Sequence, residues 1–586
     1  MPQTRPPRGS RRGSPQLRLR VGFVLIAMVL SLFGARLVQL QGLDPNSYAA
    51  MAAAEGLVQV VLPAERGDIL DRNGKPIARS VDGMMIVADP QLTSEHATAL
   101  ARFLYRRLSV DYPGTLAKLR AEGSRFEYIA RRVPSTIATA TVEAAARQGF
   151  VGLDTRRDPV RDYPAGDVAA NLVGFMGTDE PLAGFERTFN DQLAGKDGSE
   201  RYEVGGGNRL PLGQSTVTEP VDGQDLHTTI DLDLQWYTQR VLRQTVDGSG
   251  GESGFAVVMD TRTGEILALA DDPTFDANHP TDTPKADLGS RAMQDVYEPG
   301  SVEKVLTLSS LINEHQVTPR TKIVVPPALN REDRTIHDWF PHGTIHLTLA
   351  GVIAQSSNIG TVLAADRFRS GQLYDYLRSF GLGRKTDIGV RGETPGLLPA
   401  RSQWTHQMQD RIAFGQSLSV NGVQMAAAVN TIANRGVRVD PSIVEGRATT
   451  VDGDVVGTDT TTEHRVVSAR AASATTHMME RVVDPDVGVA PGAAVPGYRV
   501  AGKTGTAQRV GAECGCYDGT FTVSFAGFAP ADDPRFTIYV VVQNPTNGGG
   551  GGSVAGPAFA KIMSYALRRY AVPPTGTKPS SLPVTW

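Results

Sequence analysis

A run of apolar and small residues near the start of the chain constrains its fold more than any other feature. Residues 21–35 contain no charge, and beyond Arg36 the apolar sequence continues to Leu40, which gives about the 20 residues that span a bilayer. A signal peptide cleaved after Ala35 would need a small residue at the position of the bulky Phe33. The sequence therefore predicts an uncleaved membrane anchor over residues 21–40.

The charges around this span predict its orientation. Residues 1–20 contain several arginines and no acidic residue, and their Pro and Ser residues are expected to prevent a helix there. Few basic residues follow the span closely. Basic flanks stay on the cytoplasmic side, so we expect a cytoplasmic basic tail and everything beyond residue 41 outside the cell membrane. No second apolar run of this length follows, which predicts a single-pass protein.

Composition excludes several classes of protein. The 586 residues are 40% hydrophobic and carry a net charge of only -3, so nothing global indicates a nucleic-acid partner. The length predicts two or three domains. The two cysteines, Cys514 and Cys516, exclude a disulfide scaffold and a multi-cysteine metal cluster; they form a strained disulfide or remain free thiols. We expect neither a metal nor a cofactor.

In the part of the chain expected outside the membrane, the pattern of predicted elements changes near residue 221. Residues 41–221 mix short amphipathic helices, such as 51–55 and 97–108, with strand-like pieces such as 58–62, and an Asn-Gly hairpin signal lies at residues 72–75. The three glycines at 205–207 resemble a joint. From residue 222 the patterns indicate an α+β domain with an antiparallel sheet flanked by helices. Its expected elements are a helix at 232–246, strands at 255–259, 265–269, 521–528 and 536–542, and a helix at 558–570. Residues 573–586, rich in Pro, Thr and Ser, read as a disordered tail.

A serine and a lysine lie three residues apart at Ser301 and Lys304. Pro299 and Gly300 form a turn before them and apolar residues follow, so a buried helix is expected to start here with both side chains on one face. A desolvated lysine amine can take the proton of a serine hydroxyl, and a helix N-terminus offers N–H groups to an oxyanion. Alone the pair is weak evidence, because S-x-x-K is often a helix cap followed by a solvated lysine.

Two later motifs strengthen the interpretation. Ser356 and Asn358 form an S-x-N motif beside apolar, helix-like sequence and suit a proton relay and an amide ligand. Residues 503–506 form K-T-G-T after a strand-like approach; lysine with hydroxyls suits a carboxylate, and glycine allows close approach to the backbone. Each motif has an ordinary explanation as a cap or a turn, but the three in this order are much less common.

The ordered set resembles the signature of penicillin-binding proteins and class A β-lactamases, with Ser357 in place of the usual Asp. Over nearly its whole length the chain is similar to class B penicillin-binding proteins, most of all to the division-type (FtsI-like) peptidoglycan D,D-transpeptidases of actinobacteria. Nothing resembles the glycosyltransferase domain of class A members. Further stretches that carry the resemblance are residues 65–68, 71–74, 161–166, 184–186, 268–273, 291–292, 414–418 and 430–436.

The resemblance implies a pedestal (dimerisation) domain at 41–221, a transpeptidase domain at 222–572 and a serine acyl-enzyme mechanism. Ser301 would attack the carbonyl between the last two D-alanines of a stem peptide, or the ring of a β-lactam. Lys304 would act as general base, Ser356 would relay the proton and Asn358 would hold the network. The remaining implied roles are a substrate carboxylate held by Lys503, Thr504, Gly505 and Thr506, and an oxyanion hole formed by the backbone N–H groups of Ser301 and Thr506.

The resemblance also implies partners. These are peptidoglycan stem peptides, β-lactams, and, through the membrane helix and pedestal, a polytopic SEDS-type (FtsW-like) glycosyltransferase with other divisome proteins. Three alternatives stay open: an elongation-type transpeptidase, a D,D-carboxypeptidase and a weakly active division scaffold. A penicillin sensor would need a cytoplasmic signalling part, for which residues 1–20 are too few.

Glu303 departs from the family pattern, which more often has small or aromatic residues between the serine and the lysine. At 3.6 residues per turn Glu303 lies about 200° around the helix from Ser301. We therefore expect its side chain to point away from the nucleophile, toward a partner charge in the core. A carboxylate facing Lys304 would instead keep that amine protonated and weaken it as a base.

Two other clusters fit loops better than sites. His337, His342 and His346 do not have the spacing of a helical H-E-x-x-H zinc motif and are interpreted as polar loop histidines. The five glycines at 548–552 are followed by no Lys-Ser or Lys-Thr, so they are no phosphate loop. A flexible loop near the rim of the active site is the better interpretation.

Overall fold

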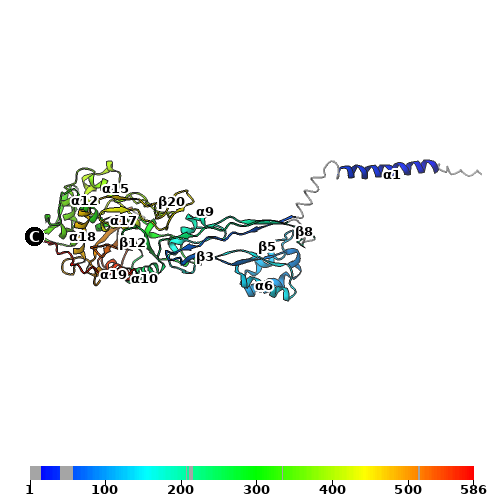
Figure 1. Cartoon of the computed structure of the whole chain (residues 1–586), viewed down its shortest axis with the longest axis horizontal. Coiled ribbons are helices and arrows are strands. Elements are labelled where there is room, and N and C mark those ends of the chain that lie inside the picture. The colour runs from blue at the N-terminus through cyan, green and yellow to red at the C-terminus, as the bar shows by residue number, and fades with distance from the viewer. Residues whose placement is uncertain (1–14, 40–56, 206–207, 210–214, 333, 512–514) are drawn as a thin grey trace, which may run out of the picture. The chain divides into compact units, whose positions relative to one another are not determined.

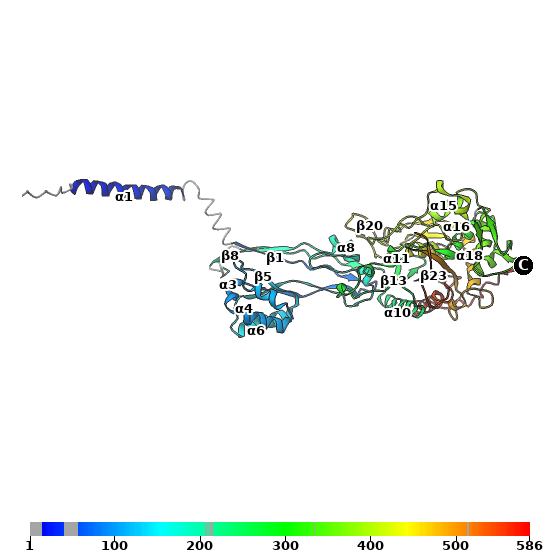
Figure 2. The same cartoon turned by 180° about the vertical axis from the view of Figure 1, so that it is seen from behind.

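The computed structural model describes residues 15–39, 57–205, 208–209, 215–332, 334–511 and 515–586. It divides into two compact units, the first comprising residues 1–63 and 196–221 and the second residues 64–195 and 222–586 (Figures 1 and 2). The expected helix at 51–55, two of the glycines at 205–207 and the Cys514–Cys516 pairing lie outside the described residues.

The first unit contains the apolar helix and a small sheet. Helix α1 (Pro15–Val38) is long and apolar enough to cross a membrane. It begins earlier than the predicted span because the fixed φ of proline suits a first helical turn, so the expectation that Pro and Ser prevent a helix before residue 21 was wrong for residues 15–20. Strand β8 (Gly198–Gly205) pairs antiparallel with β1 (Leu57–Leu62), β9 (Asn208–Arg209) and β10 (Ser215–Thr218).

The first part of the second unit has two small sheets. One has the order β11 (Leu226–His227), β2 (Ile69–Leu70), β3 (Pro76–Val81) and β7 (Val160–Asp162), and the predicted Asn-Gly turn joins β2 to β3. The other places β4 (Gly83–Ala88) between β5 (Glu127–Pro134) and β6 (Leu153–Arg157). Helices α4 (Ala97–Leu108) and α6 (Ser135–Arg147) share a separate apolar core with this second sheet. The short helices here are α3 (Pro90–Thr93), η2 (Ser94–His96), α5 (Tyr112–Lys118), α7 (Ala170–Val173), α8 (Gly184–Thr188) and α9 (Asn190–Leu193).

A buried carboxylate joins three of the stretches that carry the family resemblance. Glu186 is fully buried, and its two carboxylate oxygens accept hydrogen bonds at 2.6 Å from Nε of Arg66 and from Nε of Arg161. A second guanidinium nitrogen of Arg66 donates to the Glu186 carbonyl at 2.8 Å. A buried charge is tolerated only when it is paired and hydrogen-bonded. The buried Glu186 carboxylate therefore requires Arg66 and Arg161 beside it.

The second part of this unit is built on a five-stranded antiparallel sheet, as predicted. The order is β13 (Ile266–Asp272), β12 (Ser253–Asp260), β24 (Phe536–Gln543), β23 (Tyr517–Ala529) and β22 (Ala501–Val510). Every residue of β12, β13 and β24 is buried, which requires cover on both faces of the sheet. The predicted strands at 255–259, 265–269, 521–528 and 536–542 are confirmed.

Helices supply that cover (Figure 1). Helices α10 (Leu232–Ser249) and α19 (Ala555–Arg569), both predicted, pack on each other and on the sheet, and α17 (Gly422–Ala433) and α18 (Ala469–Val483) also pack on its strands. The remaining helices are α11 (Arg291–Gln294), α12 (Lys304–Asn313), α13 (Leu349–Ala354), α14 (Asn358–Ala365), α15 (Gln372–Ser379), α16 (His406–Ile412), η3 (Pro280–Asp282), η4 (Lys285–Asp287), η5 (Gly300–Val302), η6 (Arg401–Gln403) and η7 (Pro491–Ala493). Two-stranded sheets pair β14 (Lys322–Val325) with β17 (Ile345–Thr348), β15 (Leu329–Arg331) with β16 (Arg334–Ile336), β18 (Val437–Val439) with β21 (Glu463–Arg465), and β19 (Ala448–Thr449) with β20 (Val455–Val456).

The segment 573–586 is docked onto the domain, so the prediction of a disordered tail was wrong. Thr348 donates to the carbonyls of Val584 (from N, 3.1 Å) and Pro583 (from Oγ1, 2.5 Å), while the indole of Trp586 donates to Leu347 O at 3.0 Å. The Lys322 amine lies 4.5 Å from the Trp586 ring centroid. The polar composition suggested disorder, but the carbonyls of the tail satisfy groups at the start of α13 and an aromatic anchor fixes its end.

Candidate active site

Ser301 lies in the turn η5, directly before the buried helix α12. Gly300 has φ +56, and a Cβ at Gly415 would lie 2.0 Å from the Gly300 carbonyl, so both positions require glycine. The Gly300 N–H donates to Gly415 O at 3.0 Å. The stretch 414–418 therefore supports the serine turn, and the serine side chain stays partly exposed.

Lys304 is fully buried beside this turn. Its Nζ donates to Asn358 Oδ1 and to the Ser356 carbonyl, both at 2.7 Å, and lies 3.4 Å from Ser356 Oγ. Burial lowers the pKa of Lys304 to about 7; the charge of Asp338 opposes that shift, as an ionised Glu303 would. An amine with this pKa is substantially unprotonated at neutral pH and can act as a base.

Ser301 and Lys304 are not hydrogen-bonded to each other within the part of the chain that the structure describes. The amine is turned toward the S-x-N motif instead. Catalytic hydrogen bonds are often long before substrate binds, so this geometry is compatible with a base that acts on the serine.

The S-x-N and K-T-G motifs meet at Ser356. Ser356 has φ +59, an uncommon conformation for a residue with a side chain, and its Oγ accepts a 2.8 Å hydrogen bond from Lys503 Nζ. Lys503 is fully buried in β22, and burial together with the nearby Lys304 amine lowers its pKa well below the usual value. One hydroxyl therefore lies between two amines, an arrangement suited to proton relay.

The rest of the K-T-G-T stretch lines the cleft. Lys503 Nζ also lies 3.1 Å from Thr504 Oγ1, and Thr506 is exposed on the same strand. A Cβ at Gly505 would lie 2.2 Å from Ser524 Oγ, which accounts for the glycine. Sixteen residues, among them Ser301, Ser356, Asn358, Thr504 and Thr506, line a cavity of about 740 Å³ whose wall also includes glycines of the 548–552 stretch.

Asp338 is a site residue that the sequence reasoning missed. Its buried carboxylate accepts hydrogen bonds from Ser357 Oγ at 2.7 Å and from the Ile359 N–H at 2.9 Å, and it lies 3.2 Å from His342 Nε2. It thereby fixes the turn that presents Asn358 to Lys304. A single aspartate in a loop belongs to no motif that marks it as a site residue. The three neighbouring histidines were interpreted as loop residues, so the segment gave no reason to single out Asp338.

Glu303 points away from the cleft, but the expected partner charge is not there. The fully buried carboxyl interacts with Thr307 Oγ1, at 2.8 and 3.0 Å from its two oxygens, and forms no ion pair among the described residues. Burial raises the pKa of Glu303 well above its usual value. This shift favours the neutral acid over a carboxylate that would hold Lys304 protonated.

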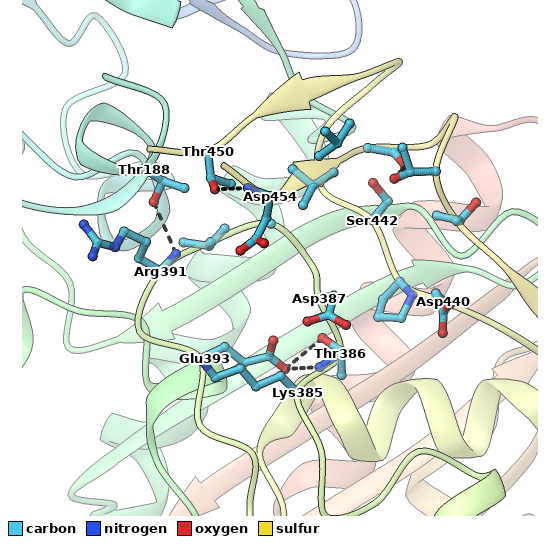
Figure 3. A pocket seen from close by; sticks show the side chains of 18 of the residues that line it. Thr188, Lys385, Thr386, Asp387, Arg391, Glu393, Asp440, Ser442, Thr450 and Asp454 are labelled. Atoms are coloured by element: carbon cyan, nitrogen blue, oxygen red, sulfur yellow. Dashed lines mark hydrogen bonds between the residues drawn. The ribbon is translucent and has the colours of Figure 1, made fainter. Parts of the chain in front are cut away.

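The other polar features do not form a second centre of this kind. Among the described residues, no group of three or more His, Cys, Asp and Glu side chains could hold a metal ion. A separate cavity of about 560 Å³ lies between the loops at 385–393 and 440–462 (Figure 3). There Glu393 accepts two 2.8 Å hydrogen bonds from Thr386, and no candidate from the sequence lines the cavity.

Comparisons with known proteins identify the family of this chain. Residues 254–564 match the family model described as the penicillin-binding protein transpeptidase domain, and residues 61–181 match the penicillin-binding protein dimerisation domain. The chain belongs to the class B penicillin-binding proteins. It is a penicillin-binding transpeptidase, an enzyme of the serine acyltransferase type.

Related sequences and structures agree over most of their length. Penicillin-binding protein PbpB of Mycolicibacterium smegmatis is 35% identical, with 96% of this chain and 92% of the relative covered. Peptidoglycan D,D-transpeptidase FtsI of Escherichia coli is 32% identical, with 95% and 92% covered. The crystal structure of penicillin-binding protein 3 from Mycobacterium tuberculosis, complexed with aztreonam, has a TM-score of 0.69 and 32% identity, covering 90% of this chain and 100% of that one.

Proposed function

We propose that this class B penicillin-binding protein is a peptidoglycan D,D-transpeptidase that crosslinks stem peptides at the division septum through an acyl-enzyme on Ser301. The observation that carries the proposal is the buried Lys304 amine, with a pKa of about 7, held by Asn358 and the Ser356 carbonyl next to Ser301. The septal role is supported by the similarity to FtsI.

In the acylation step Lys304 takes the proton of Ser301 Oγ as that oxygen bonds to the carbonyl carbon between the last two D-alanines. The backbone N–H groups of Ser301 and Thr506 stabilise the oxyanion. Ser356, bridged to Lys304 and Lys503, passes a proton to the leaving D-alanine amine as its C–N bond breaks. An amine of a neighbouring stem then attacks the ester, and Ser301 regains its proton.

Lys503, Thr504, Gly505 and Thr506 bind the carboxylate of the leaving D-alanine. The low pKa of Lys503 reflects burial without an anion beside it, and a substrate carboxylate would raise that pKa again. Binding of the correct substrate thus favours the charged form of Lys503 within the proton network.

The membrane topology and the partners belong to the same proposal. Helix α1 anchors the chain with its basic N-terminus in the cytoplasm and the catalytic domain outside. Helix and pedestal dock a polytopic FtsW-like glycosyltransferase and other divisome proteins, which would place crosslinking next to glycan synthesis.

Labelling of the full-length protein in detergent with a fluorescent penicillin tests the chemistry. We expect covalent label on the wild type, none on Ser301→Ala, and at least about a hundredfold slower labelling of Lys304→Ala, the size of a general-base contribution. Absence of label on folded wild type would contradict the proposal. Depletion in cells tests the role, since filaments support division and rounded cells support elongation.

A further inference from the structure

Two cavities meet at Ser301. The larger, of about 740 Å³, is lined by Ser356, Thr504 and the glycines at 550–552. The smaller, of about 260 Å³, extends between the β15–β16 hairpin and helix α16. Both are lined by Ser301, Asn358, Gln416 and Thr506, so they are continuous at the nucleophile.

The smaller cavity is lined by arginines. Arg331 is already engaged, because it donates to Asp366 at 2.6 Å and lies 3.5 Å from Asp410, a carboxylate that also lines the cavity. Arg334 and Arg411 also line the cavity, and among the described residues neither has an ion pair or a side-chain hydrogen bond. Within the described part of the chain, two guanidinium groups therefore stand without an ion-pair partner in a cavity that begins at the nucleophile.

Glu298, the other acid close to this region, forms no ion pair with Arg411 among the described residues. Its carboxylate accepts hydrogen bonds from Ser417 N at 2.8 Å and from Tyr517 OH at 3.0 Å. Burial raises the pKa of Glu298, and the charge of Arg411 opposes that shift, so the two groups attract each other without direct contact.

The direction of the substrate follows from the proposed function, on which this inference rests. If the carboxylate of the leaving residue lies on Thr504 and Thr506 in the larger cavity, the donor chain on the other side of the scissile bond must leave Ser301 in another direction. The smaller cavity is the space that opens there. The acceptor amine replaces the leaving amine, so it enters from the larger cavity.

We propose that Arg411, assisted by Arg334, binds a carboxylate on the donor stem peptide upstream of the scissile bond, and so selects acyl donors that carry an acidic side chain there. A guanidinium matches a carboxylate with two parallel hydrogen bonds, and a partly enclosed cavity strengthens that contact. Residues of the donor, rather than only its D-alanines, then contribute to specificity.

The test compares two penicillins that differ only in whether the acyl side chain ends in a carboxylate or in its primary amide. Second-order acylation rates of Ser301 are measured on the full-length protein. We expect the wild type to prefer the carboxylate, and Arg411→Gln to lose about tenfold with the carboxylate and less than about twofold with the amide, as for one charged hydrogen-bonded contact. The acylation rate of Arg411→Lys with the carboxylate penicillin should lie between the rates of the wild type and Arg411→Gln. The matched control is Arg369→Gln, whose side chain is 83% exposed and lies outside the cavity.

Each other outcome overturns the inference. Equal slowing with both penicillins means that Arg411 only supports the fold of α16, and unchanged rates with both mean that it does not touch the donor. If Arg411→Gln does not fold, Arg334→Gln at the exposed hairpin gives the same comparison. Failure of the proposed function is distinct, since neither penicillin would then acylate the wild type.

Discussion

Replacing Glu303 by glutamine tests how the enzyme keeps Lys304 available as a base. Among the described residues, the Thr307 hydroxyl is the one hydrogen-bond partner of the buried Glu303 carboxyl, and burial raises the pKa of Glu303 well above the usual value. Lys304 owes its pKa of about 7 chiefly to burial. Glutamine has nearly the same shape as a protonated glutamate, so the pKa of Lys304 should not change in Glu303→Gln.

The magnitude follows from the pKa of about 7. The fraction of free Lys304 amine rises from about 0.1 at pH 6 to about 0.9 at pH 8, so acylation should accelerate about tenfold with rising pH over that interval. If Glu303 were ionised, its removal would lower the pKa of Lys304 by about 1–3 units. Acylation at pH 6 would then be up to about tenfold faster in Glu303→Gln than in the wild type.

The assay is the rate of fluorescent-penicillin acylation from pH 5.5 to pH 9, with Glu143→Gln, an exposed position in the pedestal, as the matched control. We expect wild type, Glu303→Gln and control to share a midpoint near 7. A midpoint that falls by a full unit or more in Glu303→Gln alone would refute the idea that burial keeps Glu303 neutral.

Three further substitutions probe other contacts. Asp338→Ala should slow acylation at least about tenfold, because Ser357 Oγ and the Ile359 N–H each lose a buried acceptor worth about 1–3 kcal/mol; an unchanged penicillin-acylation rate would contradict its positioning role. Arg161→Met should destabilise the pedestal by about 3 kcal/mol, since Glu186 loses one of its two charged partners and keeps Arg66 and the Tyr163 hydroxyl; this is read from the thermal unfolding midpoint in detergent. Trp586→Ala should cost about 1–2 kcal/mol and expose the tail to limited proteolysis, through loss of the contacts to Leu347 O and Lys322; a tail as resistant as wild type would count against docking.

The elements that the sequence predicted well are those whose pattern is local. The α4 helix at 97–108 has buried residues at helical spacing, and the β12–β13 hairpin joins two apolar runs through a tight turn. The three motifs could be placed in one site only through the family resemblance, because their side chains come from α12, the α13–α14 turn and the sheet strand β22. Spacing in the sequence does not indicate which residues from distant segments come together in the folded protein.

What escaped prediction depended on tertiary partners. Helical geometry gave the direction of Glu303, but only packing shows that the side chain meets Thr307 rather than a charge. Asp338 and the tail at 573–586 were missed because neither a single loop carboxylate nor a polar terminal segment differs in composition from solvated sequence. Arg411 likewise belongs to no motif, and only its position in the wall of the smaller cavity distinguishes it from other arginines.

The position of β24 has a consequence for how the enzyme matures. This strand lies between β12 and β23 at the middle of the sheet, yet it follows β12 by most of the domain. Pairings of such long sequence separation form slowly, because loop closure precedes any gain from the contacts. In the proposed topology the chain crosses the membrane from its N-terminal end, so the nucleophile emerges long before the sheet that buries Lys304 and Lys503 can close. A chain halted during export would carry Ser301 outside the cell and still be unable to react with a penicillin.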